Sequence, residues 1–333
     1  MLRFTRSALL CATLAAFTAA AETPKFGPEL QGFHYPYPLQ QFSFTSQGQT
    51  LKMGYMDVPP EGAANGRTAL LLHGKNFCAA TWQDTIKALI KAGYRVIAPD
   101  QIGFCSSTKP AHYQYSFQQL AQNTHSLLQN LKISKAIVIG HSTGGMLATR
   151  YSLMYPQAVE QLVMVNPIGL EDWKAKGVPW RSVDQWFARE LNTTAEGIRN
   201  YEQRTYYGGQ WKPEYDRWVD MLAGLNNGPG HRLVAWNSAL IYDMIFTQPV
   251  YYEFKDLQTP TTLMIGTADT TAIGSDIAPP AVKARIGHYA ELGKQAAKLI
   301  PHATLIEFAG LGHAPQMEEP ERFHQALLKA LQP

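Results

Sequence analysis

The sequence has few cysteines, no concentrated positive charge and no long apolar segment beyond its first residues. Three cysteines occur in 333 residues, without a C-x-x-C pair, which argues against a dithiol redox motif. Lysine and arginine form no run or stripe and the formal net charge is +3, so nucleic acid is not an expected partner. No His/Cys/Asp cluster has metal-ligand spacing and no nucleotide-binding glycine loop is present. We therefore expect neither a metal nor a cofactor.

The first residues have the pattern of a secretory signal peptide. Arg3 and Arg6 precede an apolar run from Ser7 to Phe17, and Ala19-Ala20-Ala21 offers a cleavage site. The run is too short to span a bilayer as a helix, so we expect a cleaved signal and no stable membrane anchor. We predict export to the periplasm or the medium, with cleavage near Ala21.

The rest of the chain alternates buried strands with amphipathic helices. Continuous apolar segments at 68–72, 95–98, 136–139, 162–165, 261–265 and 304–308 are separated by helical patterns, which predicts a parallel sheet covered on both faces. A segment dense in tryptophan and tyrosine interrupts the alternation and has helical spacing, which suggests a cap over the sheet edge. The predicted organisation is a signal peptide at 1–21, an extended arm at 22–39, an α/β core at 40–169 and 260–333, and a helical cap at 170–259.

A serine stands between two glycines at the end of one apolar run. Ile137-Val138-Ile139 predicts a buried strand, Gly140-His141-Ser142-Thr143-Gly144 follows, and helical spacing begins at Met146. Strand, sharp turn and helix are the setting in which G-x-S-x-G forms a nucleophile elbow. The turn needs small neighbours because it holds the serine above the sheet in a strained conformation. We therefore predict that Ser142 is a nucleophile.

A serine hydroxyl needs a base to take its proton, and the base needs an acid to orient it. The candidates follow strand ends, because the loops there converge over the nucleophile. Asp269 follows the strand at 261–265, and Asp276, further along the same loop, is the alternative acid. His313 follows the last strand, at 304–308, in a glycine-containing loop. We predict Asp269 as the acid and His313 as the base.

Acyl transfer also needs hydrogen-bond donors for the developing oxyanion. The backbone amide of Thr143, directly after the nucleophile, is one candidate. The loop after the first parallel strand supplies the second, for which we predict the amide of Lys75, with Asn76 as the alternative. Only the backbone of Lys75 is used here, and its side chain is expected to be a solvated charge.

Together these segments resemble the α/β-hydrolase superfamily, in the branch of epoxide hydrolases, haloperoxidases, meta-cleavage C–C hydrolases and small esterases. The resemblance covers nearly everything after Leu39 and implies a mostly parallel, eight-stranded sheet flanked by helices, with an inserted helical cap. Epoxide hydrolases and haloalkane dehalogenases carry aspartate where this chain has Ser142, which argues against both activities. The resemblance rests on Leu72-His73-Gly74, Pro99-Asp100-Gln101-Ile102-Gly103, Gly140-His141-Ser142-Thr143-Gly144-Gly145, Gly266-Thr267-Ala268-Asp269, and Gly312-His313 followed by Glu318-Glu319-Pro320-Glu321.

The resemblance also relates the two cysteines that remain after signal cleavage. In the strand order of this fold, the strands ending at His73 and Asp100 are neighbours, and Cys78 and Cys105 each lie five residues past those ends. A Cys78–Cys105 disulfide that braces the oxyanion loop is therefore our hypothesis for an oxidising compartment. Two unrelated buried thiols are the alternative.

These features predict an exported serine hydrolase that cleaves a carboxylic ester or lactone through Ser142, His313, Asp269 and an acyl-enzyme intermediate. An aromatic cap suits a small to medium apolar acyl group, and a small-molecule substrate is the expected partner. A C–C bond hydrolase, an amidase or peptidase, and a perhydrolase would use the same three residues. A non-catalytic binding protein on this fold is the remaining alternative. The patterns do not identify the substrate or the oligomeric state.

Overall fold

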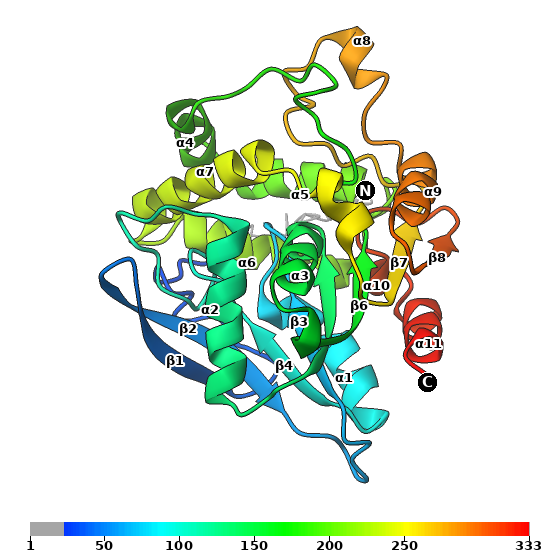
Figure 1. Cartoon of the computed structure of the whole chain (residues 1–333). Helices are drawn as coiled ribbons and strands as arrows, with labels where there is room; N and C mark the ends of the chain where they lie inside the picture. The colour runs from blue at the N-terminus through cyan, green and yellow to red at the C-terminus, as the bar shows by residue number, and fades with distance from the viewer. Residues whose placement is uncertain (1–22, 333) are drawn as a thin grey trace, which may run out of the picture.

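The computed structural model describes residues 23–332, which form a central sheet, helices on both of its faces and a helical cap (Figure 1). The predicted signal peptide and the cleavage position near Ala21 lie outside the described residues. Nowhere in residues 23–332 is a helix both long and apolar enough to span a bilayer.

The sheet has eight strands in the order β1-β2-β4-β3-β5-β6-β7-β8. β1 pairs with β2 and β2 with β4 in antiparallel fashion, and all other pairs are parallel. The prediction of a mostly parallel, eight-stranded sheet is thereby confirmed. The strands are β1 (Leu39–Ser46), β2 (Gln49–Val58), β3 (Thr68–Leu72), β4 (Arg95–Pro99), β5 (Ala136–His141), β6 (Val159–Val165), β7 (Thr261–Gly266) and β8 (Ala303–Phe308).

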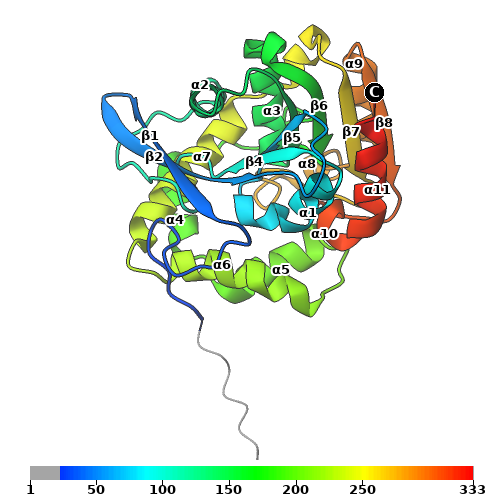
Figure 2. The same cartoon turned by 90° about the horizontal axis from the view of Figure 1, so that it is seen from below.

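Side chains of each buried strand alternate between two apolar layers. In β3, Leu70 and Leu72 pack toward α2 (Phe117–Asn130), α3 (Thr143–Met154) and α9 (Tyr289–Leu299). Ala69 and Leu71 pack toward α1 (Gln83–Lys91) and α11 (Pro320–Ala330) on the opposite face. Figure 2 shows the sheet between these two sets of helices. Because both faces are covered, the strands are apolar throughout rather than alternating with polar residues.

The cap is made of four helices inserted between β6 and β7, and it lies over the edge of the sheet where the parallel strands end (Figure 1). After β7, the loop that carries the short helix α8 (Pro280–Lys283) extends to the same side, and its Asp276 pairs with Arg181 at 2.8 Å. The cap helices are α4 (Val183–Leu191), α5 (Ala195–Thr205), α6 (Asp216–Asn226) and α7 (His231–Thr247). The remaining short helices are η1 (Ala79–Trp82), η2 (Pro156–Ala158), η3 (Pro213–Tyr215), η4 (Tyr251–Asp256) and α10 (Pro315–Glu318).

One carboxyl group inside the cap lacks the hydrogen bonds that a buried charge requires. Glu202 of α5 is 1% exposed, and neither of its carboxylate oxygens has a hydrogen-bond partner within the described part of the chain. Burial raises the pKa of Glu202 to about 8. The side chain is therefore protonated at neutral pH, because ionisation in an apolar site without donors is unfavourable.

Because Glu202 is buried and protonated, we expect the free energy of unfolding to fall as the pH rises. Glu202 ionises at a pKa of about 4.3 in an unfolded chain and about 8 in the folded protein, so between these values the folded state keeps a proton that the unfolded state releases. Glu202→Gln removes this titration, and we expect its Tm to exceed that of the wild type by a margin that grows from pH 5 to pH 8. Thermal melts at several pH values, with the exposed Glu196→Gln on the same helix as control, measure the margin. A margin independent of pH would contradict the assignment.

Candidate active site

Ser142 is the single residue that connects β5 to α3, and its backbone has a conformation that few residues with side chains adopt. Its φ is 57° and its ψ is −122°, and its amide donates to the carbonyl oxygen of Val165 at 3.1 Å. The residue is 5% exposed. A strained position of this kind persists only where the surroundings enforce it, and it is common at functional sites. The geometry is that of the elbow that the sequence pattern predicts.

Close packing around the turn is what enforces this conformation. A Cβ on Gly140 would lie 2.2 Å from the carbonyl oxygen of Gly144, and a Cβ on Gly144 would lie 2.1 Å from that of Leu72. On the facing loop, a Cβ on Gly74 would lie 2.8 Å from Cβ of Ser142. The loop after β3 therefore lies directly against the serine, and this approach requires the absence of a side chain at position 74.

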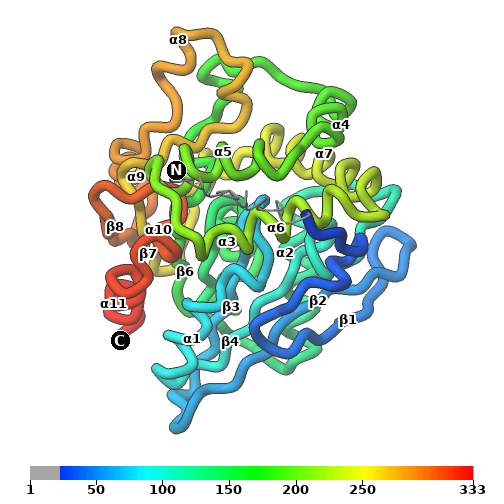
Figure 3. Tube along the Cα trace, turned by 180° about the vertical axis from the view of Figure 1, so that it is seen from behind, coloured from blue at the N-terminus to red at the C-terminus, as the bar shows by residue number. Residues whose placement is uncertain are grey.

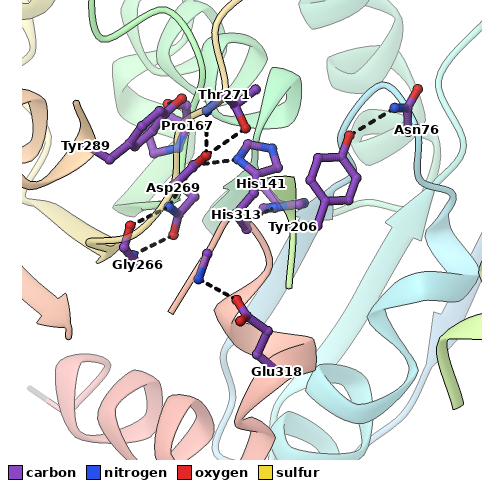
Figure 4. Close-up of polar contacts among 12 residues, drawn as sticks. Asn76, His141, Pro167, Tyr206, Gly266, Asp269, Thr271, Tyr289, His313 and Glu318 are labelled. Carbon is purple, nitrogen blue, oxygen red and sulfur yellow. Dashed lines mark hydrogen bonds and ion pairs between the residues drawn. The ribbon is translucent and has the colours of Figure 1, made fainter. Parts of the chain in front are cut away.

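His313 and Asp269 are joined by a short hydrogen bond. Nδ1 of His313 lies 2.6 Å from Oδ2 of Asp269, and neither side chain has exposed surface (Figure 4). The carboxylate requires a proton on Nδ1, so Nε2 carries the lone pair of the neutral ring. Nε2 is buried and has no hydrogen-bond partner in residues 23–332. The ring is therefore oriented to accept a proton at that nitrogen.

Three further hydrogen bonds satisfy the buried carboxylate of Asp269. Oδ1 accepts from the amide of Thr271 at 2.8 Å and from its hydroxyl at 2.6 Å. Oδ2 accepts from Nδ2 of Asn166, just past the end of β6, at 2.9 Å. Asn166 is itself held by β7, because its Oδ1 accepts from the amide of Gly266 at 2.8 Å. These donors stabilise the ionised form of a carboxyl group that has no contact with solvent.

The backbone around His313 is also held in place. Nε2 of His141, the last residue of β5, donates to the carbonyl oxygen of His313 at 2.8 Å. Burial, together with the neighbouring His313, lowers the pKa of His141 well below its ordinary range, so His141 is a neutral donor. Oε1 of Glu318 accepts from the amide of Gly312 at 2.7 Å. Burial raises the pKa of Glu318 to about 7, against the effect of this hydrogen bond.

Ser142 and His313 come from neighbouring parts of the same edge, but the structure contains no direct hydrogen bond between these two described residues. They are linked through His141, which precedes the serine and contacts the histidine carbonyl. Tyr206 of the cap stacks on the His313 ring, with centroids 4.9 Å apart. Ser142 and His313 are therefore brought to the same edge of the sheet by β5, β8 and the cap.

Amide donors for an oxyanion lie on either side of Ser142. Neither the amide of Lys75 nor that of Thr143 donates to any acceptor among the described residues. Thr143 directly follows Ser142, and Lys75 follows Gly74, which packs against the serine. The amide of Asn76 is also unpaired within the described chain, so both alternatives for the second donor remain. A negatively charged intermediate requires backbone amides that have no other acceptor, and these amides meet that condition.

The Lys75 side chain differs from the expectation of a solvated charge. Nζ of Lys75 pairs with Oε2 of Glu190 in α4 at 2.9 Å, and both side chains are 13% exposed. The ammonium group lies 3.8 Å from the centroid of the Tyr242 ring. Burial opposes ionisation of Glu190, but Lys75 and the Ser238 hydroxyl together hold the pKa of this carboxyl below its ordinary value. The cap supplies these partners, which no pattern near position 75 reveals.

A cavity of about 290 Å³ opens where the loop after β3 meets the cap. Lys75 and Asn76 line it, and they directly follow Gly74, which packs on Ser142. Nδ2 of Asn76 donates to the hydroxyl of Tyr206 at 2.9 Å. The cavity walls are mixed, with apolar side chains from Ile198, Leu222, Leu225 and Val234 and polar ones from Arg189, Glu190, Asn192, Thr193, Thr194, Tyr201, Asn226 and Tyr242.

Cys78 and Cys105 form a disulfide with Cα atoms 5.9 Å apart. It links the loop after β3 to the loop after β4, next to the buried carboxylate of Asp100. Within residues 23–332, these three side chains form a cluster with the spacing of a metal site, but both sulfurs are used by the disulfide. The cluster therefore offers no thiolate for a metal.

Sequence reasoning missed several residues that hold the site together. Asn166 follows the strand at 159–165, so its position at a strand end was a usable signal. Thr271, two residues after Asp269, had a similar signal. No sequence signal pointed to the Lys75 side chain, Glu190 or Tyr206, because their contacts join the cap to the core.

The two aspartates of the loop after β7 allow a matched test. Asp269→Asn places an amide against Nδ1 of His313, so the ring loses the tautomer that leaves Nε2 free, and we expect the rate of Ser142 labelling by a fluorophosphonate to fall by about a hundredfold or more. Asp276→Asn is the control, since Asp276 is 49% exposed and pairs with Arg181. The labelling rates of both variants show which aspartate orients His313, and thermal melts verify that both variants fold. A larger loss in Asp276→Asn would assign the acid to that residue.

Comparison with known proteins places this architecture. A family model for the alpha/beta hydrolase fold matches residues 69–320. The crystal structure of a probable hydrolytic enzyme from Pseudomonas aeruginosa is 66% identical, with a TM-score of 0.93 over 93% of this chain and 99% of that chain. The AB hydrolase superfamily protein YfhM of Bacillus subtilis is 38% identical over 112 residues, and a cis-3-alkyl-4-alkyloxetan-2-one decarboxylase of Xanthomonas campestris is 29% identical over 172 residues.

The two curated relatives are matched over only part of their length. The alignments cover 33% and 47% of this chain, and 39% and 57% of the relatives. The family model, in contrast, spans the sheet from β3 onward, the cap and the loops that carry Ser142, Asp269 and His313. The chain belongs to the alpha/beta hydrolase fold family.

Proposed function

We propose that this hydrolase is a serine carboxylesterase that uses Ser142, His313 and Asp269. The observation that carries the proposal is the buried Asp269–His313 pair, whose Nε2 is left without a partner among the described residues, beside a serine on a strained elbow. A fully satisfied carboxylate, an oriented imidazole and a serine between unpaired amides are the parts that acyl transfer needs.

The proposed reaction has two halves. Oγ of Ser142 attacks the ester carbonyl carbon while Nε2 of His313 takes the hydroxyl proton, and the tetrahedral oxyanion is held by the amides of Thr143 and Lys75. The carbon–oxygen bond to the alcohol breaks, and His313 returns the proton to the departing alkoxide. A water molecule then repeats the sequence on the acyl-enzyme, releasing the acid and restoring Ser142.

The cavity between the loop after β3 and the cap supports an acyl group of moderate length as substrate. Its volume of about 290 Å³ and its aliphatic side chains from α5, α6 and α7 suit a chain of several carbons. Lys75 does not act as an anion-binding charge in this proposal, since Glu190 pairs with it. A neutral ester or lactone fits these walls better than an anionic one.

The proposal includes export. The basic and apolar residues before Ala21 motivate it. A disulfide between Cys78 and Cys105 supports it, because such bonds persist in oxidising compartments and are rare in a reducing cytosol.

The test uses a panel of p-nitrophenyl esters from acetate to decanoate, with lactones, amides and a C–C substrate beside them. We expect hydrolysis of esters with an optimum at medium chain length, and Ser142→Ala should lose both turnover and fluorophosphonate labelling. Ser126→Ala, in α2 on the flank of the sheet, is the control and should keep both. Turnover confined to amides or C–C substrates would replace the esterase assignment, and labelling that survives in Ser142→Ala would remove the nucleophile.

A further inference from the structure

The first described residues run along the cap and contact α6 closely. Residues 23–38, the described part of the predicted arm before β1 begins at Leu39, are called the arm below and lie beside α6 (Figure 3). The amide of Phe26 donates to the carbonyl oxygen of Gly224 in α6 at 2.9 Å. A Cβ on Gly224 would lie 2.3 Å from the Phe26 ring, and one on Gly228 would lie 1.8 Å from the Phe26 carbonyl oxygen. The arm therefore fits where α6 and the residues just past its end lack side chains.

The same helix forms a wall of the cavity. Leu222, Leu225 and Asn226 of α6 line it, and Gly224, which contacts the arm, lies between the two leucines in sequence. One helix thus separates the arm from the space that the substrate is proposed to occupy. Because helix interiors and close contacts deform little, a helix supported on its outer side presents a defined inner surface.

Arg217, near the start of α6, holds the arm at a second point. Its Nη2 donates to the carbonyl oxygen of His34 at 2.8 Å, and its guanidinium lies 5.3 Å from the centroid of the Phe33 ring. Nη1 donates to Oε1 of Gln83, at the start of α1, at 2.8 Å. The arm, the cap helix and the core meet at this one side chain.

The other end of the arm is joined to the loop after β3 through Asp100. The hydroxyl of Tyr35 donates to Oδ2 of the buried Asp100 at 2.5 Å. Oδ1 of Asp100 accepts from the amide of Ala79 at 2.7 Å, and Ala79 follows the disulfide cysteine Cys78. Edge-to-face contacts between Phe26 and Phe33 and between Phe33 and Tyr35, each with centroids 5.7 Å apart, connect the two ends of the arm.

We propose that the arm is a strap that fixes the α6 wall of the cavity relative to the oxyanion loop, and that Phe26 thereby determines which acyl lengths the enzyme accepts. The inference rests on the proposed esterase function. In this proposal a long acyl chain enters the cavity and contacts Leu222 and Leu225, which line it, whereas an acetyl group stays next to Ser142. Displacing the wall therefore affects long esters selectively, and Phe26 and Tyr35 act as positioning residues rather than catalytic ones.

The selective variant is Phe26→Ala. We expect KM for p-nitrophenyl hexanoate to rise about fourfold, the effect of losing roughly one methylene's worth of apolar contact, while kcat and KM for the acetate stay unchanged. Phe42→Ala removes a ring that stacks on Phe44 in the β1–β2 hairpin, and it is the matched control with no change in the hexanoate-to-acetate ratio. Equal losses on both esters in Phe26→Ala would reduce the arm to a general stabilising segment and overturn the proposal.

Tyr35→Phe tests the Tyr35 end of the strap independently of the Phe26 end, because it keeps the ring and removes only the hydrogen bond to Asp100. It should lower kcat for both esters to the same degree and leave the hexanoate-to-acetate ratio as in the wild type. A change in that ratio instead of in kcat would contradict the proposed division between the two ends.

Hydrogen exchange provides a measurement that needs no substrate. Amides of α6 should exchange faster in Phe26→Ala than in the wild type, with α9 as an internal reference on the other side of the molecule. Unchanged α6 exchange would refute the strap whatever the kinetics. If the wild-type protein hydrolyses no ester, the proposed function fails, and faster α6 exchange would still support the mechanical part of the inference.

Discussion

A carboxylate with no exposed surface requires hydrogen-bond donors, and here residues at the surrounding strand ends supply them. The Asp269 side chain has no exposed surface, and a carboxylate in such a place is tolerated only when polar hydrogens surround it. The donors come from Asn166 after β6, Thr271 after β7 and His313 after β8. Because all of them must reach the same two oxygens, the ends of three neighbouring strands are tied together, and the orientation of the imidazole follows from the same requirement.

That arrangement extends to Ser142, the proposed nucleophile, through the backbone of His313 and the chain that joins His141 to Ser142. His141 ends β5, supports the His313 carbonyl and directly precedes Ser142. Its neutrality, a consequence of burial, keeps a second positive charge away from His313 when that ring takes a proton. Four adjacent parallel strands therefore contribute to one connected hydrogen-bond network, and a shift of any one strand end would displace the residues at the others.

The cap is part of the same network. Glu190 and Tyr206 hold the two residues that follow Gly74, and Tyr206 also stacks on His313. The wall of the cavity and the candidate oxyanion donors thus share contacts. A molecule bound in the cavity would contact the residues that position these amides, and binding energy away from a reacting bond can in this way contribute to a reaction.

The sequence was sufficient where spatial position follows from local order. The ends of parallel strands lie at one edge of the sheet, so residues just after apolar runs are neighbours in space. The sheet, the elbow at Ser142 and the candidates Asp269 and His313 could be predicted on that basis. Asn166 and Thr271 obey the same rule and were within reach of it.

The Lys75–Glu190 pair is a different case, since it joins residues 115 apart. Nothing near position 75 indicates that its side chain is buried against Tyr242, because the partner helices are placed by tertiary packing. The same holds for Glu202, whose lack of hydrogen-bond donors is a property of the cap interior. The candidate catalytic groups at strand ends are therefore visible in the sequence, while the residues that line the cavity depend on how cap helices with weak local signals pack over the sheet.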